Sequence, residues 1–202
     1  MAVMIEPEME MIVSNGQPGW VTGELPPRYA ELAGQIAALQ TEARTYEGVA
    51  GVLWQTGGPL TLAVRDLFAA LQLDTVLMET GANYDLRIQL EGSRRLLVLA
   101  AGAPDSIDRK DEVIGRVLAT LQKDAGDEDR VVVVSNAFCD MPLAARRDEP
   151  VSVEALKLIR GLGANVVASS TLFGIWRYSF KDLAGAKKSL MNLHTQEGGI
   201  FR

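Results

Sequence analysis

The side chains that could do chemistry are few, and most are carboxylates in the middle of the chain. Asp85 follows Tyr84 in a segment where polar and apolar residues alternate. The charged residues that could join it are Glu79, Asp105, Asp108, Lys110 and Glu112. Carboxylate oxygens suit Mg²⁺, but the ion keeps its waters unless several ligands converge. The alternative is that Asp108 caps a helix whose acidic first turn favours its N-terminus.

The other reactive residue types are isolated from one another along the chain. His194, the only histidine, has no cluster of cysteines or carboxylates around it, which argues against a zinc site. Cys139 precedes Asp140, so its thiol is not expected to be activated. The hydroxyl run Ser169-Ser170-Thr171 lacks a neighbouring base, and we interpret Ser170 as a helix cap. We therefore expect neither a metal site nor a cofactor.

Three extended segments must position Asp85. The first runs from Asp74 to Glu79, and the second runs from Tyr84 to Leu90. The third, Arg95 to Ala101, is an almost continuous apolar run, which is typical of a strand buried on both faces. Glu91-Gly92-Ser93 has the composition of a turn, so the second and third segments should pair as an antiparallel hairpin.

Helices and strands alternate after this hairpin. Apolar stripes predict helices over 60–71, 108–123, 152–162 and 171–178, and short apolar runs predict strands over 131–134 and 165–168. A hairpin followed by β-α-β-α predicts a mixed α/β fold with parallel pairing in its second half. We interpret the C-terminal residues 196–201 as a frayed end in preference to a docking tail.

A long helix is predicted ahead of this domain. Pro26-Pro27 suits the first turn of a helix, where a missing N–H costs nothing. Apolar residues then recur at alternating steps of three and four, the heptad pattern of a coiled coil, at Tyr29, Leu32, Ile36, Leu39, Ala43, Tyr46, Ala50 and Leu53. The stripe predicts self-association or a partner helix, and the alternative is packing on the chain's own domain. Gly48 and Gly51 favour an end of the stripe before Trp54.

The hairpin region resembles a known family. Residues 53–64 read LWQTGGPLTLAV, residues 84–88 read YDLRI, and residues 96–102 read LLVLAAG. The later matching segments are Val134-Ser135-Asn136, Pro142, Arg146 and Ser170-Thr171-Leu172-Phe173. In order and spacing they are similar to bacterial nuclease-like domains of the PD-(D/E)xK superfamily, which often follow a coiled-coil linker. The resemblance implies a restriction-endonuclease-like mixed sheet flanked by helices.

The resemblance also implies where a catalytic site would stand. That family holds Mg²⁺ between two carboxylates on adjacent strands, and a lysine two residues beyond the second carboxylate activates water. Asp85 matches the first carboxylate, whereas Leu99 and Ala101 stand at the positions of the second carboxylate and the lysine. Leucine offers the ion no oxygen and alanine carries no charge, so the site is degenerate. Asp85 is then expected to accept hydrogen bonds from backbone amides near Gly102.

Charge and composition limit the partners. The formal net charge is -6 and the sequence pI is about 4.9. Nucleic-acid binders usually present a basic surface, so these values disfavour nucleic acid as a partner without excluding a small contact. No apolar run approaches the roughly 20 residues that span a bilayer. The single cysteine and an acidic start unlike a secretory signal favour a cytoplasmic protein.

Together these patterns predict three parts: an irregular arm over 1–25, a heptad helix over 26–53 and a nuclease-like α/β domain over 54–202. The expected function is that of a non-catalytic pseudonuclease. It would act as a scaffold, adaptor or regulatory module that forms a homo-oligomer, or binds a partner helix, through residues 29–53. One alternative is a Mg²⁺-dependent nuclease of defence or DNA repair with a relocated active site. Another is a module that binds nucleic acid without cutting it.

Overall fold

The computed structural model describes residues 18–146 and 149–202, which divide between two compact units with a boundary between Glu47 and Gly48. The first unit holds a short 3-10 helix, η1 (Gly19–Glu24), and most of helix α1 (Pro27–Ala50). The arm expected over 1–25 falls largely outside the described residues, and within the described part Trp20 is exposed. No helix in the described ranges is long and apolar enough to cross a membrane.

The second unit alternates helices and strands. Its elements are η2 (Gly51–Leu53), α2 (Gly57–Ala70), β1 (Thr75–Leu77), β2 (Leu86–Gln89), β3 (Arg95–Ala103), α3 (Glu112–Lys123), β4 (Asp129–Ala137), η3 (Leu143–Ala145), α4 (Val153–Gly161), β5 (Asn165–Ala168), α5 (Ser169–Ser179), α6 (Leu183–Thr195) and β6 (Gly199–Phe201). The predicted helices and strands are all present with shifted ends. The mixed α/β class predicted from the sequence is therefore confirmed.

One six-stranded sheet holds its strands in chain order from β1 to β6. β1, β2 and β3 pair antiparallel, and β3 to β6 pair parallel. The predicted hairpin is confirmed, because Leu86 of β2 lies opposite Val98 of β3. Its turn places Gly92 at a φ of 68°, which glycine adopts without strain.

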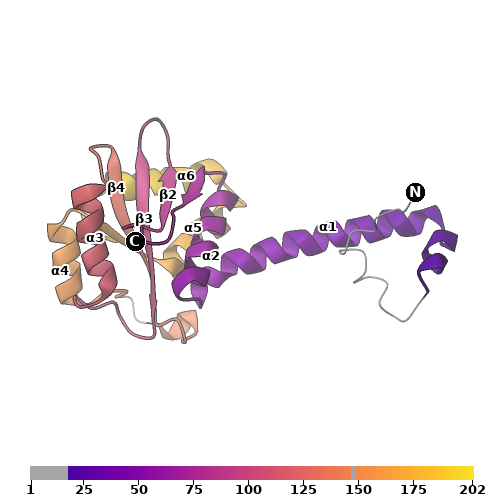
Figure 1. Ribbon diagram of the computed structural model, residues 1–202, viewed down its shortest axis with the longest axis horizontal. Helices are drawn as coiled ribbons and strands as arrows, with labels where there is room; N and C mark the ends of the chain where they lie inside the picture. Colours follow the sequence, from indigo (N-terminus) through magenta and orange to yellow (C-terminus); the bar gives the residue numbers. More distant parts are fainter. Residues whose placement is uncertain (1–17, 147–148) are drawn as a thin grey trace. The chain divides into compact units, whose positions relative to one another are not determined.

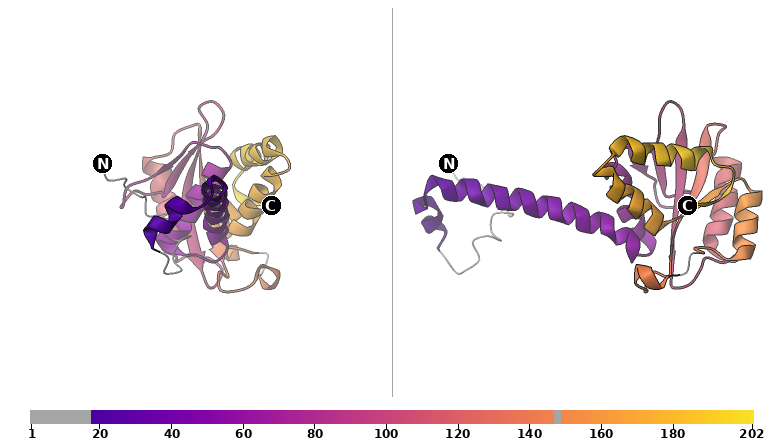
Figure 2. Two further views of the ribbon diagram at one scale, coloured as in Figure 1. Left: turned by 90° about the vertical axis from the view of Figure 1, so that its right-hand side faces the viewer. Right: turned by 180° about the vertical axis from the view of Figure 1, so that it is seen from behind.

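Helices cover both faces of the sheet and give the unit three layers (Figure 1). On one face, α3 and α4 pack against Leu97, Leu99, Val131, Val133 and Val166. On the other, α2, α5 and α6 pack against Leu86, Ile88, Leu96, Val98, Val132, Val134 and Val167, with α5 and α6 side by side (Figure 2). Because successive residues of a strand point to opposite faces, the apolar run of β3 is buried on both sides, as predicted.

The core of this unit extends towards the N-terminus beyond the expected domain start at residue 54. Val49, near the end of α1, and Val52, in η2, are fully buried in the cluster around α2. Leu53, expected in the heptad stripe, lies in η2 and packs against the same cluster. Gly51 permits this approach, because a Cβ there would lie 3.1 Å from a side-chain carbon of α2.

The cap predicted for the helix over 108–123 is wrong. α3 begins at Glu112 with Asp111 at its N-cap position, so Asp108 lies outside the helix. The Asp108 carboxylate instead accepts hydrogen bonds from the backbone N–H of Arg109 and from the hydroxyl of Ser152. These two bonds, the backbone one first, hold the pKa of Asp108 below its ordinary value. Asp108 therefore joins two loops.

The C-terminal end departs most from expectation. The frayed end predicted for residues 196–201 is wrong, because β6 pairs with β5 as the outer strand of the sheet. α6, which was not predicted, packs against α5 and begins with Asp182 as an N-cap whose carboxylate accepts from the N–H of Gly185. Ser170 is not a cap either. Ala168, the last residue of β5, holds that position, since the strand runs directly into α5.

Candidate functional site

Asp85 immediately precedes β2, and its backbone N–H donates to the carbonyl of Val98 in β3. Its Oδ2 accepts a hydrogen bond from the backbone N–H of Ala100 at 2.7 Å. Its Oδ1 lies 2.6 Å from Nη2 of Arg116 in α3. A backbone partner in this part of β3 was expected, but the arginine was not. Both carboxylate oxygens thus already accept from protein donors, and a cation bound there would lie beside the positive charge of Arg116.

Leu99 and Ala101 point to the face of the sheet that α3 and α4 cover. Leu99 is fully buried in the cluster on that face, and Ala101 packs against the same cluster. Because Leu86 pairs with Val98, the next residue of β3, Leu99, is the neighbour of Asp85 across the two strands. A leucine therefore stands beside Asp85, and an alanine lies two residues further along β3, at the positions where the family resemblance implies a carboxylate and a lysine.

A cavity of about 680 Å³ opens next to Asp85. The start of α2, the loop between β1 and β2, and one side of α3 line it. Its charged lining residues are Glu79, Asp85, Glu112 and Arg116. Ala100 contributes from β3, whereas Leu99 and Ala101 do not line the cavity. The space beside the degenerate positions is filled by core packing rather than left open.

Only some of the residues considered for a relocated active site lie in one cavity. Glu79 and Glu112 share the cavity with Asp85, but Asp105, Asp108 and Lys110 do not line it. Across the described residues, no three His, Cys, Asp or Glu side chains form a group that could hold a metal ion. Among the described residues, the guanidinium of Arg116 is the positive group that pairs with Asp85. The Arg116 side chain is 27% exposed and the Asp85 side chain is 18% exposed.

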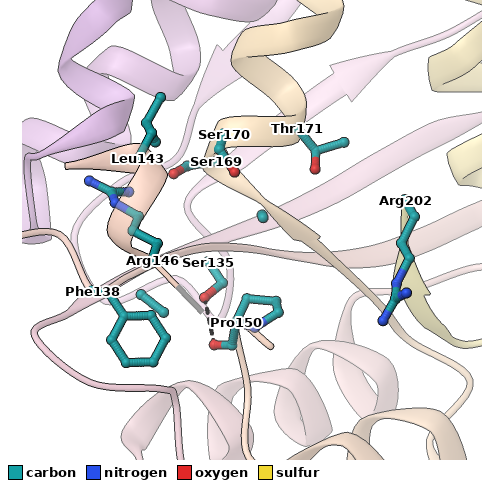
Figure 3. Close-up of a pocket in the computed structure, with 11 residues that line it drawn as sticks. Ser135, Phe138, Leu143, Arg146, Pro150, Ser169, Ser170, Thr171 and Arg202 are labelled. Carbon is teal, nitrogen blue, oxygen red and sulfur yellow. Dashed lines mark hydrogen bonds between the residues drawn. The ribbon is translucent and has the colours of Figure 1, made fainter. Parts of the chain in front are cut away.

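A second cavity, of about 450 Å³, lies at the carboxyl ends of β4 and β5 (Figure 3). The first turn of α5 supplies Ser169-Ser170-Thr171, and Arg202 lines the cavity after β6. The hydroxyl of Ser135 donates to the carbonyl of Pro150 at 3.0 Å. Among the described lining residues there is no histidine, aspartate or glutamate side chain that could act as a base for these hydroxyls.

Arg146, in the wall of this cavity, binds protein carbonyls. Its Nε donates to the carbonyl of Met141 at 2.9 Å, and its Nη2 donates to the carbonyls of Leu53 and Cys139. Its Nη1 donates to Oδ1 of Asn136 at 2.9 Å. Burial lowers the pKa of Arg146, and within the described ranges no carboxylate pairs with it. Arg146 therefore acts as a structural clamp on the chain between η2 and α2.

Asn136 completes this clamp from the end of β4. Its side chain is fully buried, and its Nδ2 donates to the carbonyl of Gln55 at 2.9 Å. Its Oδ1 accepts from Arg146 and from the hydroxyl of Ser169, each at 2.9 Å. Gly102 of β3 lets the same segment lie close, because a Cβ there would be 2.9 Å from a side-chain carbon of residue 56. Asn136, Arg146 and Ser169, hereafter the linker clamp, fix residues 53–56 to the sheet.

The isolated reactive residues have structural positions. His194 is buried at the end of α6, and its Nε2 lies 3.0 Å from the carbonyl oxygen of Glu128. Cys139 is also buried. Burial, followed by the negative charge of Asp140, raises the pKa of the Cys139 thiol. This direction opposes activation of the thiol, in line with the expectation from its position beside Asp140.

A third candidate feature is the heptad stripe of α1. Its residues within the first unit, hereafter the seam, are Tyr29, Leu32, Ile36, Leu39, Ala43 and Tyr46. Leu32 and Ile36 are each 45% exposed, Leu39 is 65% exposed and Tyr46 is 40% exposed. The Tyr46 hydroxyl donates to the carboxylate of Glu42 one turn earlier, which raises the pKa of Tyr46.

Arg116 is the residue that sequence reasoning missed. It lies on α3 between Val113 and Thr120, both buried, so it falls on the inward stripe of an otherwise apolar helix face. A basic residue on such a stripe signals a buried partner, but its partner Asp85 lies 31 positions away and could not be identified from spacing. Arg146 was noted only as part of the family resemblance, and its role as a clamp follows from its contacts.

Comparison with known proteins adds no further identification. No protein-family model matches the chain, and neither the curated proteins nor the solved structures include a significant match.

Proposed function

We propose that this chain is a non-catalytic, nuclease-like interaction module that assembles with a second copy of itself through α1. The α/β unit carries the fold, and the seam carries the assembly. The order of a helix, three antiparallel strands, a helix and a parallel strand, from α2 to β4, fits the restriction-endonuclease-like architecture that the sequence motifs imply. The role of such a module is that of a scaffold, adaptor or regulatory subunit.

The environment of Asp85 supports a non-catalytic role. In a metal-dependent nuclease this carboxylate would hold Mg²⁺ together with a second carboxylate. Here its oxygens bind the amide of Ala100 and the guanidinium of Arg116. Leu99 is buried in the core, where it can give neither a ligand to a cation nor a proton to a substrate. Glu79 and Glu112 share the cavity with Asp85, but among the described residues these carboxylates do not converge into a group that could hold a metal ion.

The exposed seam is the observation that carries the assembly. Leucine and isoleucine gain about 1.5–3 kcal/mol each when they are fully buried, so a row of them on one helix is a strong drive for association. Their alternating spacing of three and four matches the period at which one helix packs into another. The same period on both helices is what a second copy of this chain supplies. The seam is therefore proposed as the oligomerisation surface.

Light scattering during gel filtration of the full chain tests this assembly. We expect a dimer for the unmodified chain and a monomer for the double variant Ile36→Glu/Leu39→Glu, because each carboxylate would be buried between helices. Leu158→Glu is the matched control, since Leu158 is also about half exposed, at 46%, but lies on α4. A dimer that survives the double variant, or that Leu158→Glu dissociates equally well, contradicts the proposal.

A nuclease assay tests the non-catalytic part separately. We expect the full chain to leave single- and double-stranded DNA and RNA intact in Mg²⁺ or Mn²⁺. Asp85→Ala is the control for contaminating nuclease. Cleavage by the unmodified chain that disappears in Asp85→Ala would overturn the proposal and support the alternative of an active site rebuilt around Asp85.

A further inference from the structure

We infer that the second copy binds antiparallel, with Tyr29 level with Tyr46, Leu32 with Ala43 and Ile36 with Leu39. This inference rests on the proposed self-association and adds the direction and register of the two helices. It follows from the sizes of the seam residues and from the charges that flank them. Both are set by positions on α1, which is one uninterrupted helix from Pro27 to Ala50.

The spacing of the seam residues is the same in both directions, with a tyrosine at each end. Written as heptads, Tyr29, Ile36 and Ala43 occupy the a positions, and Leu32, Leu39 and Tyr46 occupy the d positions. When two such helices run in opposite directions, each a residue meets a d residue of the other copy. In the stated register, the whole seam of one copy then meets the whole seam of the other.

Residue size favours the antiparallel arrangement. In a parallel pair, Ala43 would meet Ala43, and two methyl groups would leave a thin layer between the bulkier layers of Leu39 and Tyr46. Cores tolerate such voids poorly, because the unfilled space forfeits packing contacts. In the antiparallel pair, each Ala43 faces Leu32, and Ile36 faces Leu39. The two tyrosines meet at the ends of the seam, where their hydroxyls can reach water.

Flanking charges point the same way. In the heptads above, Glu42 precedes Ala43 at a g position, and Glu47 follows Tyr46 at an e position. In a parallel pair, a g residue of one copy faces the next e residue of the other. Glu42 of each copy would therefore lie beside Glu47 of the second copy. Antiparallel pairing separates these two carboxylates. Each exposed like-charge contact costs only about 0.2–1 kcal/mol, but it would occur twice in the parallel pair and not at all in the antiparallel one.

Spin-label distances between the two copies test the direction. One nitroxide label is attached at Ala30→Cys in a Cys139→Ala background. In the proposed register, position 30 of one copy is level with position 45 of the other, fifteen residues from that copy's own label. At about 1.5 Å per residue, the two labels should lie about 22 Å apart along the helix axis. The matched control is Ala38→Cys, which lies near the centre of the register and should give a short distance in either direction. Both sites are exposed on α1.

Disulfide trapping tests the register. We expect the double variant Leu32→Cys/Ala43→Cys to form covalent dimers at least tenfold faster on oxidation than Leu32→Cys alone. Short spin-label distances at both positions 30 and 38, or equal trapping of the single variant, would show a parallel pair and overturn the inference while leaving self-association intact. A monomer without intermolecular distances would overturn both this inference and the proposed function.

Discussion

The same residue types behave in opposite ways in the two units of this chain. In the unit from Gly48 to Arg202, Leu96 and Leu99 of β3 have no accessible surface, because helices cover both faces of the sheet. In α1, Leu39 leaves 65% of its surface accessible, and Leu32 and Ile36 leave 45% each. The α/β unit buries the apolar residues of its central strands, although some of its helix residues, such as Leu158 at 46%, are as exposed as the seam. The helix presents apolar residues with a regular period and no described neighbour to bury them.

The polar groups show the same contrast. In the α/β unit, Asp85 accepts hydrogen bonds from the backbone of Ala100 and from Arg116. Asn136 donates to the carbonyl of Gln55 and accepts from Arg146, as part of the linker clamp. In the seam, the Tyr46 hydroxyl donates to the carboxylate of Glu42 one turn earlier. The α/β unit is held by long-range contacts, which supports a fixed scaffold. Along α1, the hydroxyls of Thr41 and Thr45 each donate to the backbone carbonyl one turn earlier.

The largest expected effect comes from removing a core side chain of the α/β unit. Phe68 of α2 is fully buried, so Phe68→Ala should lower the free energy of unfolding by about 3–5 kcal/mol. Denaturant unfolding followed by circular dichroism measures this change. Where the variant remains folded, its dimer mass should be unchanged, because the seam lies in the other unit. A variant that dissociates while still folded would show that the core also forms the interface.

Breaking the linker clamp should have the next largest effect. Arg146→Met keeps much of the side-chain length but leaves the carbonyls of Leu53 and Met141, and Oδ1 of Asn136, without this donor. We expect a loss of about 2–3 kcal/mol in the free energy of unfolding. Arg177→Met, at an exposed site on α5, is the control and should cost under about 0.5 kcal/mol. Equal losses in the two variants would contradict the assignment of Arg146 as a clamp.

A smaller effect is expected at Asp85. Asp85→Asn keeps the shape of the side chain but removes its charge, and we expect a loss of about 1–2 kcal/mol after allowance for partial exposure. Asp66→Asn is a matched control. Asp66 also lies 2.6 Å from an arginine Nη2, in a pair whose side chains are each 39% exposed. We expect this control to lose less than half as much. A stabilised Asp85→Asn would mean that the carboxylate is kept for a ligand at a cost to folding.

The smallest predicted effect concerns the thiol of Cys139. Because burial and Asp140 raise its pKa, deprotonation in the folded chain needs a higher pH than in the unfolded chain. Alkylation by iodoacetamide, which requires the thiolate, should therefore be slower in native protein than in urea at every pH between about 7 and 9. Mass spectrometry of timed samples measures both rates. Faster alkylation of native protein would show an activated thiol and reopen the question of chemistry at this position.

Much of the α/β framework could be predicted because its signals are local. The hairpin follows from alternation in 84–90 and the turn at Gly92, and the heptad helix follows from its period. α6 and β6 were missed for a physical reason. β6 is a three-residue strand after Gly198, and its only stabilising signal is pairing with β5, more than thirty positions earlier.

The candidate site shows the same limit. The positions of Asp85, Leu99 and Ala101 could be proposed from motif order, and the structure places Asp85 and Leu99 as neighbours across β2 and β3. Arg116, the partner of Asp85, could not be predicted, because an ion pair between a strand and a distant helix produces no periodic pattern in the sequence. Asp108 was misplaced for a related reason. Asp111 competes for the same cap, and only the contact of Asp108 with Ser152 distinguishes the two.

Sedimentation equilibrium of the unmodified chain tests the central claim most directly. Across loading concentrations from about 1 to about 100 µM, we predict a weight-average mass that rises towards twice the 21.9 kDa of one chain. The double variant Ile36→Glu/Leu39→Glu should stay at the mass of one chain over the same range. A mass of the unmodified chain that stays at 21.9 kDa at every concentration would contradict the account, because it would show that the seam does not bind a second copy.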